Sequence, residues 1–313
     1  MSLSVYLTAG LGNRLFQYAA VKGIANKYNL NFKIYAIDVN HEHNFNNYDW
    51  FISRMIKNST ECLQIPRHII TSPEFQKKNQ NIKLWLQPQS EHLGYYEPKD
   101  IHLLKNHVLY GYFQSELYFE NISTQIREDF KEPEFITPII DSYLNSNSLT
   151  INGIKLKEDE CCIIHIRLKD KLNDPRHFVH YGKYYRRAIV EIRKMNPNIF
   201  FLVLSETPND IQYIYPTLLT ELGTCNQNYT IVPRNITDYN YDQFHNFNLE
   251  IFDFYLLTRI PNIIASCSTF VWWGAWLNPT PFPEKQVYLP SRFTNDVTNN
   301  KVDMKGATII DVD

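Results

Sequence analysis

The stretch Ile163-Ile164-His165-Ile166-Arg167-Leu168-Lys169-Asp170 carries an apolar strand directly into a cluster of polar residues. In an extended strand His165 and Arg167 are two positions apart, so their side chains project from the same face. At the carboxyl end of a parallel strand, that face opens onto the crevice where α/β proteins bind ligands. A guanidinium there suits a phosphate group, because its fork of donors makes paired charge-assisted hydrogen bonds. Asp170 would hold Arg167 or the next turn in place; alternatively, the two form an ordinary ion pair.

Short apolar runs and helical patterns alternate through the second half of the chain. The expected strands are residues 161–167, 200–205, 230–233, 262–266 and 286–290, and the expected helices are 182–195, 209–222, 242–258 and 270–277. In the first of these helices, Tyr185, Ala188, Ile189 and Ile192 form an apolar stripe. Short apolar strands separated by helices are typical of a parallel sheet that is covered on both faces.

The first half begins in the same way. A strand at 3–8, a glycine-containing turn, a helix at 12–28 and a strand at 31–37 are followed later by a strand at 108–113 and a helix at 116–130. Residues 40–100 are rich in Asn and Tyr and hold short runs such as 83–86, so irregular insertions are expected there. The 313 residues suit two domains. The polar stretch 141–160 predicts a boundary between α/β, Rossmann-like domains at 1–150 and 151–313.

Composition excludes several classes of protein. A formal net charge of −2 offers no basic surface for nucleic acid. The five cysteines form an odd set without a C-x-x-C pair, which argues against zinc or a disulfide framework and for a reducing compartment. No signal-peptide pattern and no apolar run of about 20 residues is visible. A cytoplasmic protein without a membrane span is expected. Neither a zinc-protease motif, a Walker A loop nor a G-x-S-x-G elbow is present.

A glycine-containing loop joins the first expected strand to the first helix, in the run Gly10-Leu11-Gly12-Asn13-Arg14-Leu15-Phe16-Gln17-Tyr18. Glycines allow a sharp turn and a close approach to a ligand, and the helix amino terminus presents N–H groups to it. The run is not a dinucleotide fingerprint, because the third glycine position holds Leu15. A ligand loop and a tight structural turn are both open.

Two further strand ends carry candidate binding residues. Glu206 follows the strand 200–205 and would accept the two guanine N–H donors, or it is a solvated loop residue. Ser268 and Thr269 would cap the next helix and receive phosphate oxygens. The three tryptophans of that helix, Trp272, Trp273 and Trp276, are expected to pack in the core. Asp253 is either a surface charge or fixes a loop.

Taken in order, these segments resemble the α-1,2-fucosyltransferases of glycosyltransferase family 11, which share motifs with α-1,6- and protein O-fucosyltransferases. The resemblance rests on four blocks, which are the Gly10 loop continued to Ala19, Gly111-Tyr112-Phe113-Gln114-Ser115-Glu116, His165-x-Arg167-x-x-Asp170, and Ser268-Thr269-Phe270-x-Trp272-Trp273-Gly274-Ala275-Trp276-Leu277. Their joint order across nearly the whole chain is more specific than any single block.

The resemblance implies a GT-B-like fold, with two Rossmann-like domains facing a central cleft and the acceptor bound by domain 1–150. It implies an inverting, metal-independent transfer of L-fucose from GDP-β-L-fucose to a sugar hydroxyl, with a galactoside as the expected acceptor and no cofactor. The implied donor-binding residues are Gly12, Asn13, Arg14, His165, Arg167, Glu206, Ser268, Thr269 and Phe270. Arg167 would bind the β-phosphate and stabilise the charge that develops on it.

The chain departs from the family pattern at the phosphate motif. Relatives usually read His-x-Arg-Arg-Gly-Asp, whereas Leu168 and Lys169 follow Arg167 here. Lys169 or Lys171 would supply the missing charge less well, because an ammonium lacks the donor fork. This loss slightly favours a catalytically weak nucleotide- or carbohydrate-binding protein as an alternative.

The catalytic base stays open between two residues and no base at all. Asp174 is a candidate because the segment 170–174 is similar to the α-1,6 enzymes, and Asp170 is the second candidate. In the third alternative the departing phosphate takes the proton. A transferase that uses another GDP-sugar or forms an α-1,6 link is the remaining enzymatic alternative.

Overall fold

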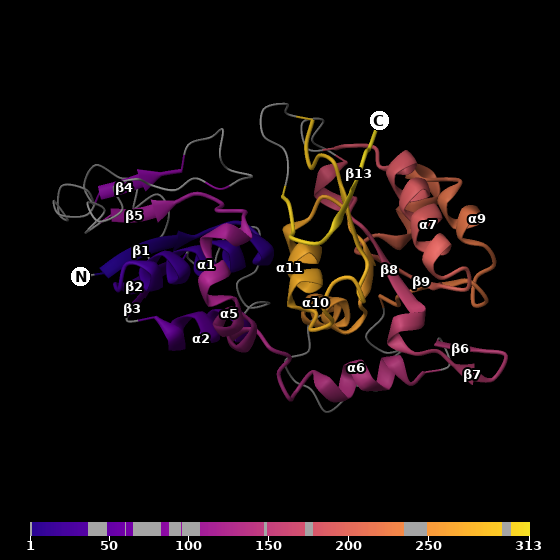
Figure 1. The fold of residues 1–313 in the computed structure, drawn as a ribbon, viewed down its shortest axis with the longest axis horizontal. Coiled ribbons are helices and arrows are strands. Elements are labelled where there is room, and N and C mark those ends of the chain that lie inside the picture. Colours follow the sequence, from indigo (N-terminus) through magenta and orange to yellow (C-terminus); the bar gives the residue numbers. More distant parts are fainter. Residues whose placement is uncertain are drawn as a thin grey trace. The chain divides into compact units, whose positions relative to one another are not determined.

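The chain forms two compact α/β units, Met1–Lys131 and Glu132–Asp313. The computed structural model describes residues 2–36, 49–59, 61–64, 83–87, 95, 107–146, 149–172, 178–234, 249–295 and 302–313. Each unit contains a parallel sheet with helices packed against it (Figure 1). The predicted α/β class and the GT-B-like pair of Rossmann-like units are therefore confirmed.

The sheet of the second unit has the strand order of a doubly wound fold. Its strands are β8 (Cys161–Ile166), β9 (Phe200–Ser205), β10 (Tyr229–Ile231), β11 (Asn262–Ile264), β12 (Val287–Pro290) and β13 (Thr308–Ile310). They are arranged β10-β9-β8-β11-β12-β13, and all pairs are parallel. The chain builds outward from β8 in one direction and then returns to build from β11 in the other. This reversal between β8 and β11 is the topological switch point, where such sheets bind ligands.

Helices cover both faces of this sheet. Figure 1 shows α7 (Gly182–Met195) and α9 (Leu218–Leu222) on one side and α10 (Leu249–Arg259) and α11 (Thr269–Leu277) on the other. Every residue of β8 and β9 is buried. Coverage on both faces explains why these strands read as continuous apolar runs. In the part of the chain that the structure describes, no helix is long and apolar enough for a membrane crossing.

The expected helix 209–222 is broken in the structure. It consists of a 3-10 turn at Pro208–Asp210, α8 (Ile211–Ile214) and α9. Pro216 explains the break, because proline has no N–H to donate and disfavours helical geometry at the residue before it. By contrast, α7 and β9 have the expected bounds, and α10 begins at Leu249. Residues 242–248 of the expected helix 242–258 lie outside the described residues.

The first unit contains a second parallel sheet of the same kind. Its strands are β1 (Ser2–Leu7), β2 (Asn31–Ala36), β3 (Glu61–Gln64), β4 (Lys83–Leu86) and β5 (His107–Tyr110), in the order β3-β2-β1-β5-β4. The direction reverses between β1 and β5. Irregular insertions were expected at 40–100, and this is wrong for β3, β4 and α2 (Asp49–Asn58). β3 and β4 are the edge strands, and they are too short to show a periodicity.

The expected helix 116–130 is also divided, into 3-10 turns at Glu116–Tyr118 and Glu120–Ile122 and the helix α5 (Ser123–Asp129). The 3-10 segment lies directly on α1 (Leu11–Lys27). A side-chain carbon added at Gly23 of α1 would overlap the backbone of Tyr118 and Phe119. Gly23 thus permits a close backbone contact between α1 and the 3-10 segment.

The division between the units falls at Lys131, before the expected boundary at 150/151. The intervening helix α6 (Thr137–Leu144) packs on α10, where the rings of Tyr143 and Phe252 lie 5.5 Å apart. Arg259 at the end of α10 forms ion pairs with Glu132 and Asp141 at 3.0 and 2.6 Å. These contacts hold residues 132–144 to the second unit.

Candidate active site

The candidate site lies at the carboxyl ends of β8 and β11. The two strands pair from Asn262↔Cys162 to Ile264↔Ile164, and their ladder ends there. The residues that follow, 165–167 and 265–268, line the two sides of the switch point. Sequence reasoning predicted both segments as ligand-binding, and the structure places them opposite each other.

His165 connects the two sides. Its Nδ1 lies 2.7 Å from Ser266 Oγ, and both residues are buried. Burial lowers the pKa of His165 to about 3, with further lowering by the charges of Arg167 and Arg234. The imidazole is therefore neutral near pH 7, so it contributes a hydrogen bond across the switch point and no positive charge.

Arg167 supplies the positive charge at the end of β8. Its Nε lies 3.6 Å from Glu206 Oε1, and the two side chains are 31% and 27% exposed. At this separation the contact is an ion pair without hydrogen-bond geometry. Glu206 follows β9, the neighbouring strand, so the structure brings together two predicted binding residues 39 positions apart.

The start of α11 forms the opposite side of the site. Ser268 Oγ accepts a hydrogen bond from Phe270 N–H at 3.3 Å and caps the helix, as predicted. The Phe270 ring lies 6.4 Å from the His165 ring and 5.4 Å from Phe254. Thr269 is the first residue of the helix. The predicted core role of the tryptophans is confirmed, since Trp272, Trp273 and Trp276 are all buried.

Arg234 and Asp253 form a pair that sequence reasoning did not identify. Arg234 follows β10, and its Nη1 donates to Asp253 Oδ1 and Oδ2 at 2.9 and 2.8 Å. Its Nε donates to Ser205 O at the end of β9, 3.0 Å away. Burial raises the pKa of Asp253 to about 7, and Arg234 opposes this rise. Of the two alternatives for Asp253, a surface charge or a residue that fixes a loop, the structure supports the second, because the side chain holds the segment after β10 to α10.

The residues that replace the second family arginine take different positions. Leu168 is fully buried, and Lys169 is exposed. Burial raises the pKa of the Cys267 thiol, and the charges of Lys171 and Arg167 oppose that rise. Lys171 is thus one of the two positive charges that act on Cys267 in the loop after β11. The side chain of Asp170 and all of Asp174 lie outside the described residues.

The remaining predicted residues lie in the first unit, at the β1/β5 switch point. Asn13 Oδ1 accepts from Gln114 Nε2 at 2.6 Å, and Arg14 is 2% exposed. Gln17 links the two sides, since its Oε1 accepts from Thr8 N–H and its Nε2 donates to Gly111 O, both at 2.8 Å. The run from Gly12 to Arg14 therefore has structural contacts within its own unit, and its contact with a donor stays a prediction.

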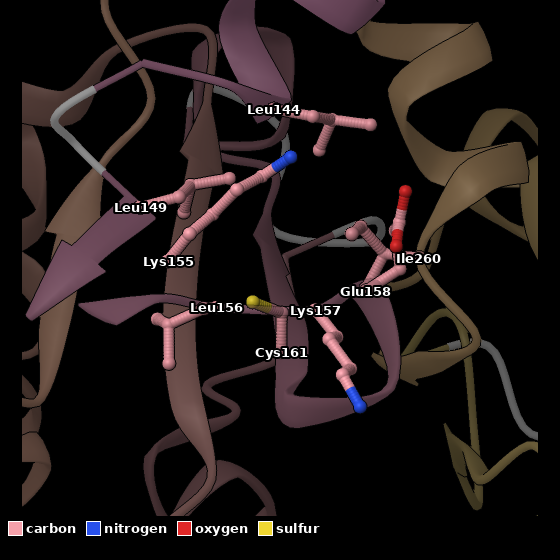
Figure 2. Close-up of a pocket in the computed structure, with 8 residues that line it drawn as sticks. All are labelled: Leu144, Leu149, Lys155, Leu156, Lys157, Glu158, Cys161 and Ile260. Atoms are coloured by element: carbon pink, nitrogen blue, oxygen red, sulfur yellow. The ribbon is translucent and has the colours of Figure 1, made fainter.

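A second feature of the second unit lies at the amino end of β8, whereas the candidate site lies at its carboxyl end. Figure 2 shows a small hollow near Cys161, the first residue of β8, with the side chains of Leu144, Leu149, Lys155, Leu156, Lys157, Glu158 and Ile260 around it. Its free volume of about 10 Å³ has room for roughly one water molecule. Within the described ranges, no three His, Cys, Asp or Glu residues are grouped as metal ligands would be.

Comparison with known proteins gives relatives along the whole chain. The O-antigen biosynthesis glycosyltransferase WbnK of Escherichia coli is 22% identical, over 95% of this chain and 97% of WbnK. An α-1,2-colitosyltransferase of Escherichia coli is 24% identical, over 90% and 92% of the two chains. Among solved structures, fucosyltransferase NodZ from Bradyrhizobium matches with a TM-score of 0.49 and 13% identity, covering 96% of each chain.

The family comparison extends over both units. The model of glycosyl transferase family 11 matches residues 2–290, which include the glycine loop of the first unit and every predicted binding residue of the second. The chain therefore belongs to glycosyltransferase family 11 and is a glycosyltransferase.

Proposed function

We propose that the enzyme transfers L-fucose from GDP-β-L-fucose to a hydroxyl of a galactoside, with inversion, without a metal ion, and with formation of an α-1,2 link. The observation that carries this proposal is Arg167, a partly exposed guanidinium at the switch point that lies beside Glu206 and a neutral His165. A family 11 transferase needs a fixed cation where its donor's diphosphate leaves, and Arg167 has the charge, exposure and position for it.

The proposed reaction is a single displacement at the anomeric carbon of fucose. The acceptor oxygen forms a bond to this carbon from the face opposite the diphosphate. The bond from carbon to the β-phosphate oxygen breaks, and its electron pair leaves with GDP. Arg167 stabilises the negative charge on that oxygen, and Lys171 adds to the positive potential. The acceptor proton passes to Asp174, to Asp170 or to the departing phosphate.

Glu206 is proposed to select guanine. Guanine presents two N–H donors on one edge, and a carboxylate accepts both, whereas adenine presents an acceptor at the corresponding ring position. Glu206 is partly exposed at the end of β9, on the opposite side of β8 from β11. A nucleotide whose phosphates reach Arg167 would therefore extend its base across β9.

Colitosyl transfer is a second candidate. The observation in its favour is the relative named as an α-1,2-colitosyltransferase, which matches 90% of this chain. Colitose lacks one hydroxyl of fucose. A site that hydrogen-bonds that hydroxyl would discriminate strongly against its absence, so the two donors are separable by rate.

The test is an assay of the purified protein with GDP-fucose, GDP-colitose and other GDP-sugars, a panel of β-galactosides, and EDTA. The expected result is transfer from GDP-fucose in EDTA, with an α-1,2 linkage in the product by NMR. Faster transfer from GDP-colitose would establish the second candidate. An α-1,6 product would correct the linkage, and activity that requires a divalent cation or a donor without GDP would overturn the proposal.

A further inference from the structure

Two tyrosines in the first turn of α7 lie beneath the switch point. Tyr184 and Tyr185 are both fully buried, and their helix packs against the six-stranded sheet (Figure 1). A buried hydroxyl is costly unless it has a partner, so its position is informative. Both hydroxyls donate to backbone carbonyls of the strands that flank the site.

The Tyr185 hydroxyl holds the end of β8. It donates to His165 O at 3.0 Å. This carbonyl belongs to the peptide that joins His165 to Ile166 and so lies one residue before Arg167. It also follows Ile164, where the ladder between β8 and β11 ends.

The Tyr184 hydroxyl holds the end of β11. It lies 2.7 Å from Ala265 O and 2.8 Å from Tyr288 O, and its single proton is shared between them. Ala265 directly precedes Ser266, the partner of His165. Tyr288 lies on β12, so this hydroxyl also ties the end of β11 to the next strand.

The two tyrosine hydroxyls supply hydrogen-bond donors to backbone carbonyls at the switch point. Where β8 and β11 separate, the carbonyl of His165 lies beyond the last paired residues of the ladder and needs another donor. Ala265 faces β12 instead, where its N–H donates to Tyr288 O at 3.0 Å. Adjacent tyrosines on one helix contact both strand ends, since Tyr185 bonds the end of β8 and Tyr184 bonds the end of β11 together with β12. Their rings are packed 5.2 Å apart, and Tyr181 and Tyr215 pack around them at 5.8 and 5.4 Å. The two hydroxyls are therefore held at a fixed separation.

We propose that Tyr184 and Tyr185 are positioning residues that set the separation between the ends of β8 and β11, and thereby the fit of the site to the diphosphate of a nucleotide donor. The side chains that would grip the diphosphate, Arg167 on one side and Ser268 on the other, follow the two bonded peptides. The proposal rests on nucleotide binding at the switch point and does not depend on which nucleotide is bound.

The test compares Tyr184→Phe and Tyr185→Phe with the wild type in binding to GDP, UDP and ADP by calorimetry. The nucleotide that the wild type binds most tightly is used for the variants, so a preference for UDP or ADP would refute the GDP donor and leave this test intact. Tyr18→Phe is the matched control, because Tyr18 is fully buried in the other unit and its hydroxyl donates to Asp129 at 2.9 Å.

Each of the two variants is expected to weaken nucleotide binding about 10-fold, which corresponds to about 1.4 kcal/mol. Amide hydrogen exchange at residues 166–168 and 266–268 should rise in the ligand-free variants. The control should lose stability without either effect. If the two variants lose stability as Tyr18→Phe does and keep wild-type affinity and exchange, the tyrosines are structural only. If Tyr184→Phe does not fold, Tyr185→Phe, which removes a single hydrogen bond, decides.

Discussion

A phosphate-binding arginine such as Arg167 must be held in a fixed orientation and must also keep N–H donors for the ligand. An arginine that is fully paired has few donors left for a phosphate, and one without a partner loses its orientation. The 3.6 Å contact with Glu206 is looser than the bidentate pair between Arg234 and Asp253, whose atoms are 2.8 and 2.9 Å apart. Of these two ion pairs, the one between Arg167 and Glu206 is the looser, and Arg167 is the guanidinium that follows β8 at the switch point.

Arg167→Ala should lower kcat/KM for fucose transfer by at least about 100-fold, the loss typical of removing one donor to a developing charge. Arg167→Lys should be intermediate, because an ammonium keeps the charge without the fork. Steady-state assays with GDP-fucose measure both. Arg187→Ala is the control, since Arg187 is exposed on α7 and donates to Asp311 O. Near-normal activity of Arg167→Ala would refute its role.

Glu206 has two possible effects that one substitution separates. Glu206→Gln should weaken GDP binding about 10-fold and leave ADP binding nearly unchanged, because only guanine loses a carboxylate that accepts both of its donors. Calorimetric titration with the two nucleotides measures the ratio. An equal loss for GDP and ADP would mean that Glu206 acts only by orienting Arg167, and would contradict guanine selection.

His165 makes the stability of the second unit depend on pH. Its pKa falls from 6.5 to about 3 on folding, so the folded protein binds fewer protons than the unfolded chain between these values. The stability that this shift contributes to the folded state is fully present above pH 6.5 and decreases as the pH falls toward 3. At pH 4 the loss should be about 3 kcal/mol, at about 1.4 kcal/mol per unit. Urea unfolding of the wild type and His165→Asn at pH 4 and 7.5 tests this, and equal pH dependence in both would contradict it.

At the scale of elements, the sequence predicts best where one pattern dominates. The stripe that includes Tyr185 and Ile189 gives α7 its bounds, and the apolar run gives β9 its bounds. The prediction of one continuous helix at 209–222 is wrong, because the apolar pattern continues through Pro216 whereas the helix does not. Proline lacks the N–H that a helix interior requires. The pair of Arg234 and Asp253 has no sequence signal, since it depends on tertiary placement of residues 19 positions apart. The hydrogen bonds of the Tyr184 and Tyr185 hydroxyls also have no sequence signal, because a buried tyrosine contributes to a sequence pattern only as an apolar residue.

A polar side chain satisfies backbone groups at each end of helix α11. Ser268 caps its start, and at its other end the buried ammonium of Lys285 donates to Ala275 O and Asn278 O, both at 3.0 Å. A positive charge at a helix carboxyl terminus is favoured by the helix dipole and satisfies carbonyls that have no partner within the helix.

Lys285→Met should therefore lower the free energy of unfolding by about 2–3 kcal/mol, because two buried carbonyls lose a charged donor. Urea unfolding monitored by tryptophan fluorescence measures this loss. Lys194→Met provides the control, since Lys194 is 62% exposed and such a substitution changes stability by about 0.5 kcal/mol or less. A loss no greater than that of the control would show that Lys285 does not support α11.

In the whole molecule, both units meet the same difficulty at their switch points. Gln17 connects Thr8 and Gly111 after β1 and β5, and His165 connects to Ser266 after β8 and β11. In each unit a buried polar side chain links two chain segments at the point where their strands separate. Rigid strand ends let loops present binding groups with fixed spacing, which is a general advantage of placing a site at this edge.

The position of the boundary between the units is testable with two fragments. Fragment 132–313 retains α6 and should fold and bind GDP, whereas fragment 151–313 loses the contacts of Ile139, Ile140, Tyr143 and Leu144, all of which are buried. Because burial of one such side chain contributes about 1.5–3 kcal/mol, the shorter fragment should be less stable by about 5 kcal/mol or more. Urea unfolding of both fragments measures the difference. Equal stabilities would place the boundary at 150/151 and make α6 a connecting segment. A longer fragment that folds and fails to bind a nucleotide bound by the whole chain would instead show that the first unit contributes to binding.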